Sequence, residues 1–380
     1  MTRSLRIGVD ARELIGDTTG AGRYLGELMR RWTMRSDSGQ RSFILYTPSA
    51  LTLAFPPGTV EQRVAGTGTG TWWEQTTLRK AVNADRPDIF FAPAYTAPIG
   101  VRVPLAVTIH DISFVAHPEW FRPRERWRRR FITARTAAAA SVVLTDSDFS
   151  RSELETRLGI AHERIRVIPP GVGSLGTRDS GLGIRDPGLG VRDSGPGVRD
   201  SEPLVLYVGS IFNRRRLPDL IAAFARAAHD MPRARLVIAG ADRTYPAQDL
   251  AAVAAAQGLG SRVELRQYVS ETELAALYSR ASVFAFLSEY EGFGFTPLEA
   301  LASNVPIVVL DTRVAREVYG LAARYVQGAD LEGIAAALRS ILLSPSSAAE
   351  QMAHAPDVLA RYSWDRAAAD TLSALEGIVV

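Results

Sequence analysis

Short apolar runs alternate with helical patterns along nearly the whole chain, and this alternation constrains the fold more than any other feature. Alternation of this kind is typical of β-α-β units, whose strands pair in parallel. With 380 residues the chain is too long for one ordinary α/β core, so we expect two doubly wound domains. The runs expected to be strands are residues 6–10, 42–46, 88–92, 105–109, 141–144, 165–168, 204–208, 235–239, 263–265, 283–287 and 307–310.

A low-complexity segment at residues 171–203 separates the two halves. Arg-Asp pairs recur there every seven residues, with glycine, serine or proline between them. A seven-residue period can indicate a coiled coil, but glycine at this density cannot sustain a helix. We therefore interpret residues 171–203 as a flexible linker between an N-terminal domain, 1–170, and a C-terminal domain, 204–361. The amphipathic tail, 362–380, is expected to pack back on the N-terminal domain.

The composition restricts both the kinds of site and the compartment. There are no cysteines, which excludes disulfides and thiolate metal sites and fits a reducing compartment. No run of 18 apolar residues occurs, and we recognise no signal peptide, so we expect a cytoplasmic protein. The net charge is only +3, and every basic residue except Lys80 is an arginine. Arginine at any single position is therefore weak evidence of selection for a phosphate contact.

The most informative stretch begins with the apolar run at 283–287, which predicts a buried strand. Gly292 and Gly294 lie in the loop that follows, and Thr296 is placed to be the N-cap of a helix. Because a helix N-terminus presents N–H groups and glycines permit close approach, the stretch predicts an anion site. Thr296 and Glu299 also fit a plain capping box, and this segment alone leaves both interpretations open.

Two further segments lie where parallel strands are expected to end. Gly20 and Gly22 follow the first strand in a loop like a phosphate-cradling turn, although a plain tight turn fits that loop better. His110 directly follows the strand at 105–109, and open α/β sheets bind ligands at such strand ends. A histidine that only bonds a neighbouring loop fits this position equally well.

Arginines and aromatic residues are interleaved between Arg122 and Arg135, with Trp127 and Phe131 one helical turn apart. A solvated helix face is one interpretation of this pattern. A peripheral contact with anionic membrane lipid, or with a phosphorylated lipid substrate, is the sharper one. The small net charge argues against a third possibility, nucleic acid.

The motifs resemble the retaining, GT-B type nucleotide-sugar glycosyltransferases of glycosyltransferase family 4, also called group 1. Residues 288–306 are similar to the family's Glu-x7-Glu segment, with Glu291 and Glu299 as its two acids. The turn after residue 208 is similar to the family's Gly-Thr…Arg-Lys-Asn-Leu segment, with Arg214 at the arginine and Arg215 at the lysine.

His110-Asp111 is similar to the family's His-Asp strand end. Weaker matches are Trp73-Glu74-Gln75, Ser147-Asp148-Phe149-Ser150 and Ile168-Pro169-Pro170-Gly171-Val172. Trp73-Glu74-Gln75 and Phe90-Phe91-Ala92-Pro93 look similar to mannosyltransferase-like members that build surface polysaccharide. Two positions depart from the family pattern: arginine replaces lysine at 215, and Gln267 stands where glycine is common.

The resemblance implies an α/β protein with the GT-B fold, two Rossmann-like, doubly wound domains that face each other across a cleft. It places the donor in the C-terminal domain and assigns roles to individual residues. Expected for catalysis are Arg214, Arg215, His110 and Glu291; for donor binding Glu299, Gly292, Phe293, Gly294, Phe295, Thr296, Gly209, Tyr268 and Val269; for the acceptor or phosphate loop Gly20 and Gly22.

The implied reaction transfers a hexose from a nucleotide diphosphate sugar, GDP-mannose or a UDP-sugar, to a glycan or lipid-linked acceptor. Retention by a front-face route needs no protein nucleophile, and neither a metal nor a cofactor is expected. The alternatives are another GT-B activity, an epimerase or a phosphorylase, and a non-catalytic scaffold that binds glycan. A pyridoxal-dependent phosphorylase would need a lysine, and the only one, Lys80, lies in the wrong half.

Overall fold

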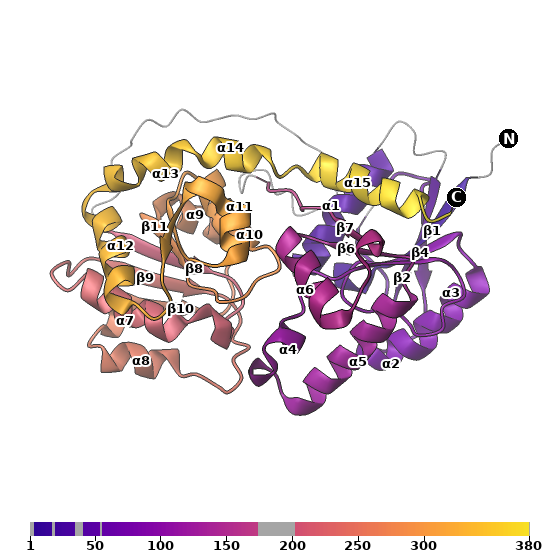
Figure 1. The fold of residues 1–380 in the computed structure, drawn as a ribbon, viewed down its shortest axis with the longest axis horizontal. Helices are drawn as coiled ribbons and strands as arrows, with labels where there is room; N and C mark the ends of the chain where they lie inside the picture. Colours follow the sequence, from indigo (N-terminus) through magenta and orange to yellow (C-terminus); the bar gives the residue numbers. More distant parts are fainter. Residues whose placement is uncertain (1–3, 17–19, 35–40, 54, 174–201, 380) are drawn as a thin grey trace.

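Two parallel sheets, one in each half of the chain, organise the protein (Figure 1). The computed structural model describes residues 4–16, 20–34, 41–53, 55–173 and 202–379. Among these residues, the sheet of lobe 1 has the order β3-β2-β1-β4-β5-β6-β7, and that of lobe 2 the order β10-β9-β8-β11-β12-β13. The strands are β1 Leu5–Asp10, β2 Arg41–Thr47, β3 Val60–Val64, β4 Ile89–Ala92, β5 Leu105–Thr108, β6 Val142–Thr145, β7 Ile165–Val167, β8 Leu204–Val208, β9 Arg235–Ala239, β10 Val263–Arg266, β11 Val283–Phe286, β12 Ile307–Leu310 and β13 Ala323–Val326.

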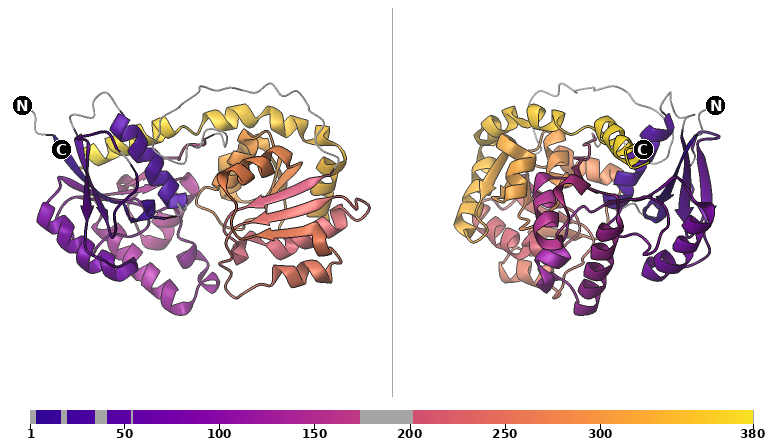
Figure 2. Two further views of the ribbon diagram at one scale, coloured as in Figure 1. Left: turned by 180° about the vertical axis from the view of Figure 1, so that it is seen from behind. Right: turned by 45° about the vertical axis from the view of Figure 1, so that its right-hand side comes forward.

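Helices cover both faces of each sheet, as parallel connections require (Figure 2). Between α2 and α3 the segment Glu74–Leu78 is π-helical, and Asn213–Arg215 is a 3-10 turn, η6. The α-helices are α1 Gly20–Met34, α2 Gly70–Trp73, α3 Arg79–Asp85, α4 Ser113–Ala116, α5 Pro123–Ala139, α6 Asp148–Leu158, α7 Leu217–Ala227, α8 Leu250–Ala256, α9 Glu271–Arg280, α10 Phe295–Ala302, α11 Arg313–Tyr319, α12 Leu331–Leu343, α13 Ala349–Ala353, α14 Ala355–Ala360 and α15 Trp364–Glu376.

All eleven expected strands are present, and each boundary agrees within one residue. The sequence did not predict β3 and β13, which lie at sheet edges. Four of the five β3 residues are exposed, and only the two ends of β13 are buried, so neither strand shows the apolar run of a central strand. The seven-residue Arg-Asp repeat lies outside the described residues.

The predicted N-cap at Thr296 is wrong. Helix α10 begins at Phe295, and its N-cap is Gly294, which has a left-handed φ of 93° and makes no side-chain cap. Because the loop ends on this glycine, the helix starts two residues earlier than a capping box at Thr296 requires. Thr296 lies inside the first turn, so capping does not account for Glu299.

The C-terminal helices connect the two lobes. Helices α13 and α14 lie on lobe 2, and α15 crosses to lobe 1, where it packs against α1 (Figures 1 and 2). Trp364 and Leu372 of α15 are buried in the lobe 1 core, and the indole of Trp32 donates to the Ala368 carbonyl at 2.8 Å. None of the helices in the described part of the chain is long and apolar enough to span a membrane.

Candidate active site at the contact between the lobes

The carboxyl ends of the two sheets face each other across the contact between the lobes. Gly292, in the loop after β11 of lobe 2, lies against the loops that follow β5 and β6 of lobe 1. Its carbonyl accepts hydrogen bonds from the hydroxyls of Ser147 at 2.5 Å and Ser150 at 3.2 Å. A Cβ at position 292 would lie 1.8 Å from the carbonyl oxygen of His110, so only glycine fits here.

Arg214 and Arg215, in the turn η6 after β8, form a buried pair of positive charges, 8% and 9% exposed. Arg215 forms an ion pair with Glu291, and the Nε of Arg214 lies 3.8 Å from the same carboxylate. The guanidinium of Arg214 lies 4.3 Å from the ring centre of Phe212, and that of Arg215 lies 4.5 Å from the ring centre of Phe286. The aromatic faces hold both charges in place and keep water away from one side.

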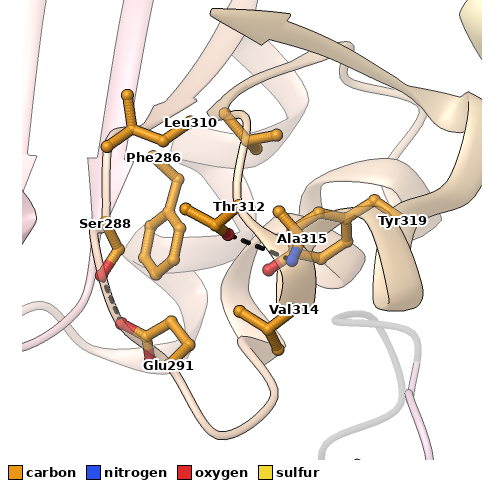
Figure 3. Close-up of a pocket in the computed structure, with 9 residues that line it drawn as sticks. Phe286, Ser288, Glu291, Leu310, Thr312, Val314, Ala315 and Tyr319 are labelled. Atoms are coloured by element: carbon orange, nitrogen blue, oxygen red, sulfur yellow. Dashed lines mark hydrogen bonds between the residues drawn. The ribbon is translucent and has the colours of Figure 1, made fainter. Parts of the chain in front are cut away.

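In this arrangement the arginine pair keeps hydrogen-bond donors that could bind an anion. The Nε atoms of Arg214 and Arg215 are buried and have no hydrogen-bond acceptor among the described residues. Glu291 also accepts from the hydroxyl of Ser288 at 2.5 Å, at the rim of a cavity of about 10 Å³ (Figure 3). That cavity holds about one water, so it is too small for a sugar ring.

Gly294 and Tyr319 fix the start of α10. The hydroxyl of Tyr319 donates to the Gly294 carbonyl at 3.0 Å, and a Cβ at position 294 would lie 2.2 Å from that hydroxyl oxygen. Phe293 is buried against Tyr362, with ring centres 5.0 Å apart. The side chain of Phe293 is thus structural, and only its backbone can contribute to the predicted donor site.

Glu299, buried on α10, is held by groups from both lobes. Its carboxylate accepts from the Tyr278 hydroxyl at 3.2 Å and forms an ion pair with Arg23 of lobe 1. The sequence analysis did not single out Arg23. The sequence feature that could have indicated Arg23 is its position directly after Gly22, in the segment that follows the first strand.

Gly20 and Gly22 lie in the first turn of a helix and not in the expected loop, and their predicted contact with a phosphate or the acceptor stays a prediction. Helix α1 begins at Gly20, so Gly22 is a buried residue of its first turn. A Cβ on Gly20 would meet no atom of the described residues within 4 Å. What this helix presents to lobe 2 is the side chain of Arg23.

His110 is half-buried, and both its ring nitrogens face acceptors. Nδ1 lies 2.8 Å from Asp146 Oδ2, and Nε2 lies 3.1 Å from the Pro93 carbonyl. Burial lowers the pKa of His110, but the Asp146 carboxylate outweighs burial, and the pKa is raised above its ordinary value. Two acceptors suit the doubly protonated ring. Both ring nitrogens of His110 are thus engaged within lobe 1.

Asp111 is a second group that the sequence analysis did not assign. Ser113 donates to its Oδ1 through both N–H and hydroxyl, at 2.8 and 2.6 Å, and Tyr95 donates to Oδ2 at 3.3 Å. Burial raises the pKa of Asp111, but the positive charge of Arg214 and the Ser113 bonds outweigh it, so the pKa is lowered. The Asp111 carboxylate of lobe 1 thus interacts electrostatically with the Arg214 cation of lobe 2.

The remaining predicted donor residues, Gly209, Tyr268 and Val269, follow strands β8 and β10 of lobe 2. Gly209 directly follows β8 and has a φ of 142°, and a Cβ at Gly240 would lie 2.0 Å from its carbonyl oxygen. Tyr268 is exposed, and Val269 packs against the core of lobe 2. These two residues follow β10, so they flank the site without joining its charged cluster.

Two family models match the chain, one in each lobe. The model for glycosyl transferases group 1 matches residues 193–356, and the model for glycosyltransferase family 4 matches residues 18–173. This chain belongs to the group 1 glycosyltransferases of family 4. The family expected from the motifs is thereby confirmed, and the glycosyltransferase carries its arginine pair and both acids of the Glu-x7-Glu segment within the matched region.

Individual relatives of this glycosyltransferase show what it is similar to. O-antigen chain mannosyltransferase B of Escherichia coli is 26% identical over 288 residues, covering 75% of this chain and 73% of that protein. The D-inositol 3-phosphate glycosyltransferase of Xylanimonas cellulosilytica is 30% identical over 281 residues, covering 71% and 65%.

Solved structures support the expected fold. The structure of HepE from Anabaena in complex with UDP and glucose has a TM-score of 0.68 and 18% identity, and covers 98% of this chain and 100% of that one. Together with the two parallel sheets, this similarity confirms the GT-B fold.

Proposed function

We propose that this glycosyltransferase transfers a hexose, mannose being favoured, from a nucleoside diphosphate sugar to a glycan or lipid-linked acceptor, with retention of configuration, in surface polysaccharide synthesis. The observation that carries the proposal is the buried pair Arg214 and Arg215 beside Glu291, opposite His110 at the contact between the lobes. The similarity to an O-antigen mannosyltransferase and to a UDP-binding structure supports the choice of acceptor class and donor class.

The arginine pair suits a departing diphosphate. When the bond between the sugar C1 and the diphosphate oxygen breaks, negative charge accumulates on the leaving group. Two guanidinium groups with unsatisfied, buried Nε atoms would stabilise that charge more than they stabilise the ground state. Arg214 and Arg215 are therefore assigned to leaving-group stabilisation, and Glu291 to binding of sugar hydroxyls.

Glu299 is assigned to the ribose hydroxyls of the donor. Because Arg23 and Tyr278 occupy the two carboxylate oxygens, a ribose can bind only if at least one of them moves. Arg23 comes from the other lobe, so its release fits a small opening between the lobes before the donor enters. The ion pair then represents the donor-free state.

Retention follows from a front-face reaction. The acceptor oxygen forms its bond to C1 on the side from which the diphosphate leaves, and the acceptor proton passes to an oxygen of the departing diphosphate. The route needs no covalent intermediate with the protein. We assign no catalytic metal or cofactor, and His110 is assigned to the transferred sugar.

Helix α5 offers a surface for anionic lipid. Trp127 is 68% exposed and stacks on Phe131 with 5.5 Å between ring centres, while Trp72 of the neighbouring helix α2 is 80% exposed. Arg128 joins the two helices through a 2.5 Å bond to the Thr71 hydroxyl. Exposed indoles beside arginines favour peripheral contact with an anionic membrane, which would bring a lipid-linked acceptor near the lobes.

The proposed function is tested by incubating the purified protein with a panel of UDP-, GDP-, ADP- and dTDP-sugars, with and without a lipid-linked glycan. Release of nucleoside diphosphate is followed, and the anomeric configuration of the product is read by NMR. Slow donor hydrolysis without acceptor and an α-linked product from an α-linked donor are expected. A scaffold would consume no donor, and an epimerase would convert the sugar without transfer.

A pyridoxal-dependent phosphorylase remains the alternative with the least support. Lys80 lies exposed on α3 of lobe 1, away from the arginine pair. Phosphate-dependent cleavage of a glycan by the purified protein would favour that alternative.

A further inference from the structure

Glu317, on α11 of lobe 2, caps the N-terminus of a helix in lobe 1. Its Oε1 accepts from the Asp148 N–H at 2.6 Å, and its Oε2 accepts from the Phe149 N–H at 2.9 Å. Asp148 and Phe149 are the first two residues of α6, so their N–H groups have no acceptor within that helix. Both oxygens of one carboxylate are therefore used by the end of a helix in the other lobe.

The contact combines charge with a fixed geometry. The N-terminus of a helix carries a partial positive charge, so a carboxylate is favoured there over a neutral acceptor. Glu317 is half-buried, and its own carbonyl accepts from the Nη2 of Arg361 at 2.8 Å. The carboxylate thus reaches α6 from a backbone that is itself held in place.

The capped end of α6 also holds His110. Asp146, two residues before the helix, lies 2.8 Å from the Nδ1 of His110. The Ser150 hydroxyl, in the first turn of α6, lies 3.2 Å from the carbonyl oxygens of both His110 and Gly292. Residues 146–150 therefore connect lobe 2 with the side chain and the backbone of His110. A shift of this segment would shift the residue that is assigned to the transferred sugar.

The Glu317 contact differs from the ion pair between Arg23 and Glu299. A ribose that binds to Glu299 has to displace a group already bound there, whereas no group assigned to the donor bonds to Glu317. The bonds from α6 to Glu317 can therefore form with the donor in place. When the lobes separate, water takes the place of Glu317 at the two N–H groups.

We propose that Glu317 is a positioning residue for the transfer reaction. By capping α6 it holds residues 146–150 against lobe 2, and through Asp146 it sets His110 at the contact between the lobes. Glu317 touches neither the donor nor the acceptor and acts only through this segment. The inference rests on the proposed function, because it assigns Glu317 to the same transfer.

Steady-state kinetics of the full-length protein, with calorimetry of GDP and UDP binding, test the inference. Glu317→Ala should lower kcat by about tenfold and change the affinity for either diphosphate by less than about twofold, because the diphosphate is assigned to lobe 2. Glu317→Gln keeps one acceptor and loses the charge, so its kcat should lie between those of Glu317→Ala and the wild type. Glu350→Gln, exposed on α13, is the matched control and should behave as wild type.

The same contact can be broken from lobe 1. Asp148→Pro removes one of the two N–H groups, and proline is favoured at the first position of a helix. Ser147, which precedes it, has an extended backbone with φ −150° and ψ 160°, and this conformation is compatible with a following proline. Asp148→Ala is the matched variant, since it loses the same ion pair with Arg151 but keeps the N–H. We expect kcat to fall in Asp148→Pro and to stay near the wild-type value in Asp148→Ala.

A distance measurement reports the contact without any reaction. The chain has no cysteine, so spin labels can be attached at Glu163→Cys in lobe 1 and Gln257→Cys in lobe 2, both exposed positions. Double electron–electron resonance then gives the distribution of distances between the lobes. We expect Glu317→Ala to broaden that distribution, and Glu350→Gln to leave it unchanged.

The outcomes separate this inference from the proposed function. A wild-type kcat in both Glu317→Ala and Asp148→Pro would overturn the inference. A lowered kcat with an unchanged distance distribution would also overturn it, as would equal losses of kcat in Asp148→Pro and Asp148→Ala. Absence of turnover in the wild type would overturn the proposed function, and the distance distributions would still decide whether Glu317 holds the lobes together.

Discussion

The His110 carbonyl oxygen lies 1.8 Å from the point that a Cβ on Gly292 would occupy. The loop after β11 therefore contacts the segment after β5 through backbone atoms, without a side chain at position 292. Ser147 and Ser150 fix this approach by donating to the Gly292 carbonyl. The two lobes therefore meet at the same place where the predicted catalytic groups converge. The spacing of the lobes at this point depends on the absence of one side chain.

Gly292→Ala is expected to force the lobes apart or shift the loop, because backbone on both sides leaves no space for a methyl group. We expect a loss of about 1–3 kcal/mol in the free energy of unfolding and a large loss of activity. Denaturant unfolding and steady-state kinetics measure both. Gly377→Ala is the control, since Gly377 has an ordinary φ of −65° at the end of α15. Wild-type stability and activity in Gly292→Ala would contradict the contact.

Arg214→Ala should lower kcat by about a hundredfold or more and change donor affinity much less, because the contribution of Arg214 is greatest as the diphosphate departs. Kinetics at saturating donor, with calorimetry of nucleoside diphosphate binding, separate the two quantities. The exposed Arg233→Ala should behave as wild type. A kcat near the wild-type value in Arg214→Ala would rule out the assigned role.

Glu299→Ala should weaken binding of a nucleoside diphosphate by about 1–3 kcal/mol, since a charged acceptor for the ribose is lost. Calorimetry measures the affinity. Capping cannot produce the loss, because Gly294 is the N-cap of α10 and Thr296 makes no side-chain cap.

Arg23→Ala should change the affinity for a nucleoside diphosphate in the opposite direction to Glu299→Ala. Without Arg23 the Glu299 carboxylate no longer has to exchange an ion pair for the ribose, so the same diphosphate should bind more tightly while the donor-free protein melts at a lower temperature. Weaker binding in Arg23→Ala would mean that Arg23 itself contacts the donor.

The His110–Asp146 pair should make stability depend on pH. The pKa of His110 is raised in the folded state, so the stabilisation is complete below the unfolded pKa of about 6.5 and disappears as the pH rises through the folded pKa. His110→Gln should therefore destabilise the protein more at about pH 6 than at about pH 9 in urea titrations. An equal loss for His110→Gln at both pH values would speak against the charged pair.

Arg128→Glu with Arg129→Glu should reduce co-sedimentation with vesicles that contain anionic phosphatidylglycerol, because about 1 kcal/mol of attraction is lost for each arginine at the surface. Neutral phosphatidylcholine vesicles serve as the control. Arg226→Glu on α7, in the other lobe, is the control for charge alone. Unchanged sedimentation of the double variant would dispose of the membrane contact.

The sequence predicted the strands of both sheets because central parallel strands are buried on both faces and read as apolar runs. It did not predict β3, whose residues are mostly exposed, because an edge strand has no such pattern. The Glu-x7-Glu segment and the arginine pair could be found from the sequence because their residues are neighbours in the chain.

Tertiary structure alone decided which groups from distant segments meet. Arg23 and Glu299 are 276 residues apart, and no local spacing indicates their ion pair. The same is true of Asp111 with Arg214 and of Gly292 with His110. The amino-acid sequence thus determined the two parallel sheets and the types of residue at the end of each strand. It did so because the local pattern of apolar and polar residues reflects which positions are buried. The packing of the lobes decided which of those ends share a site, because only the folded chain brings them within hydrogen-bonding distance.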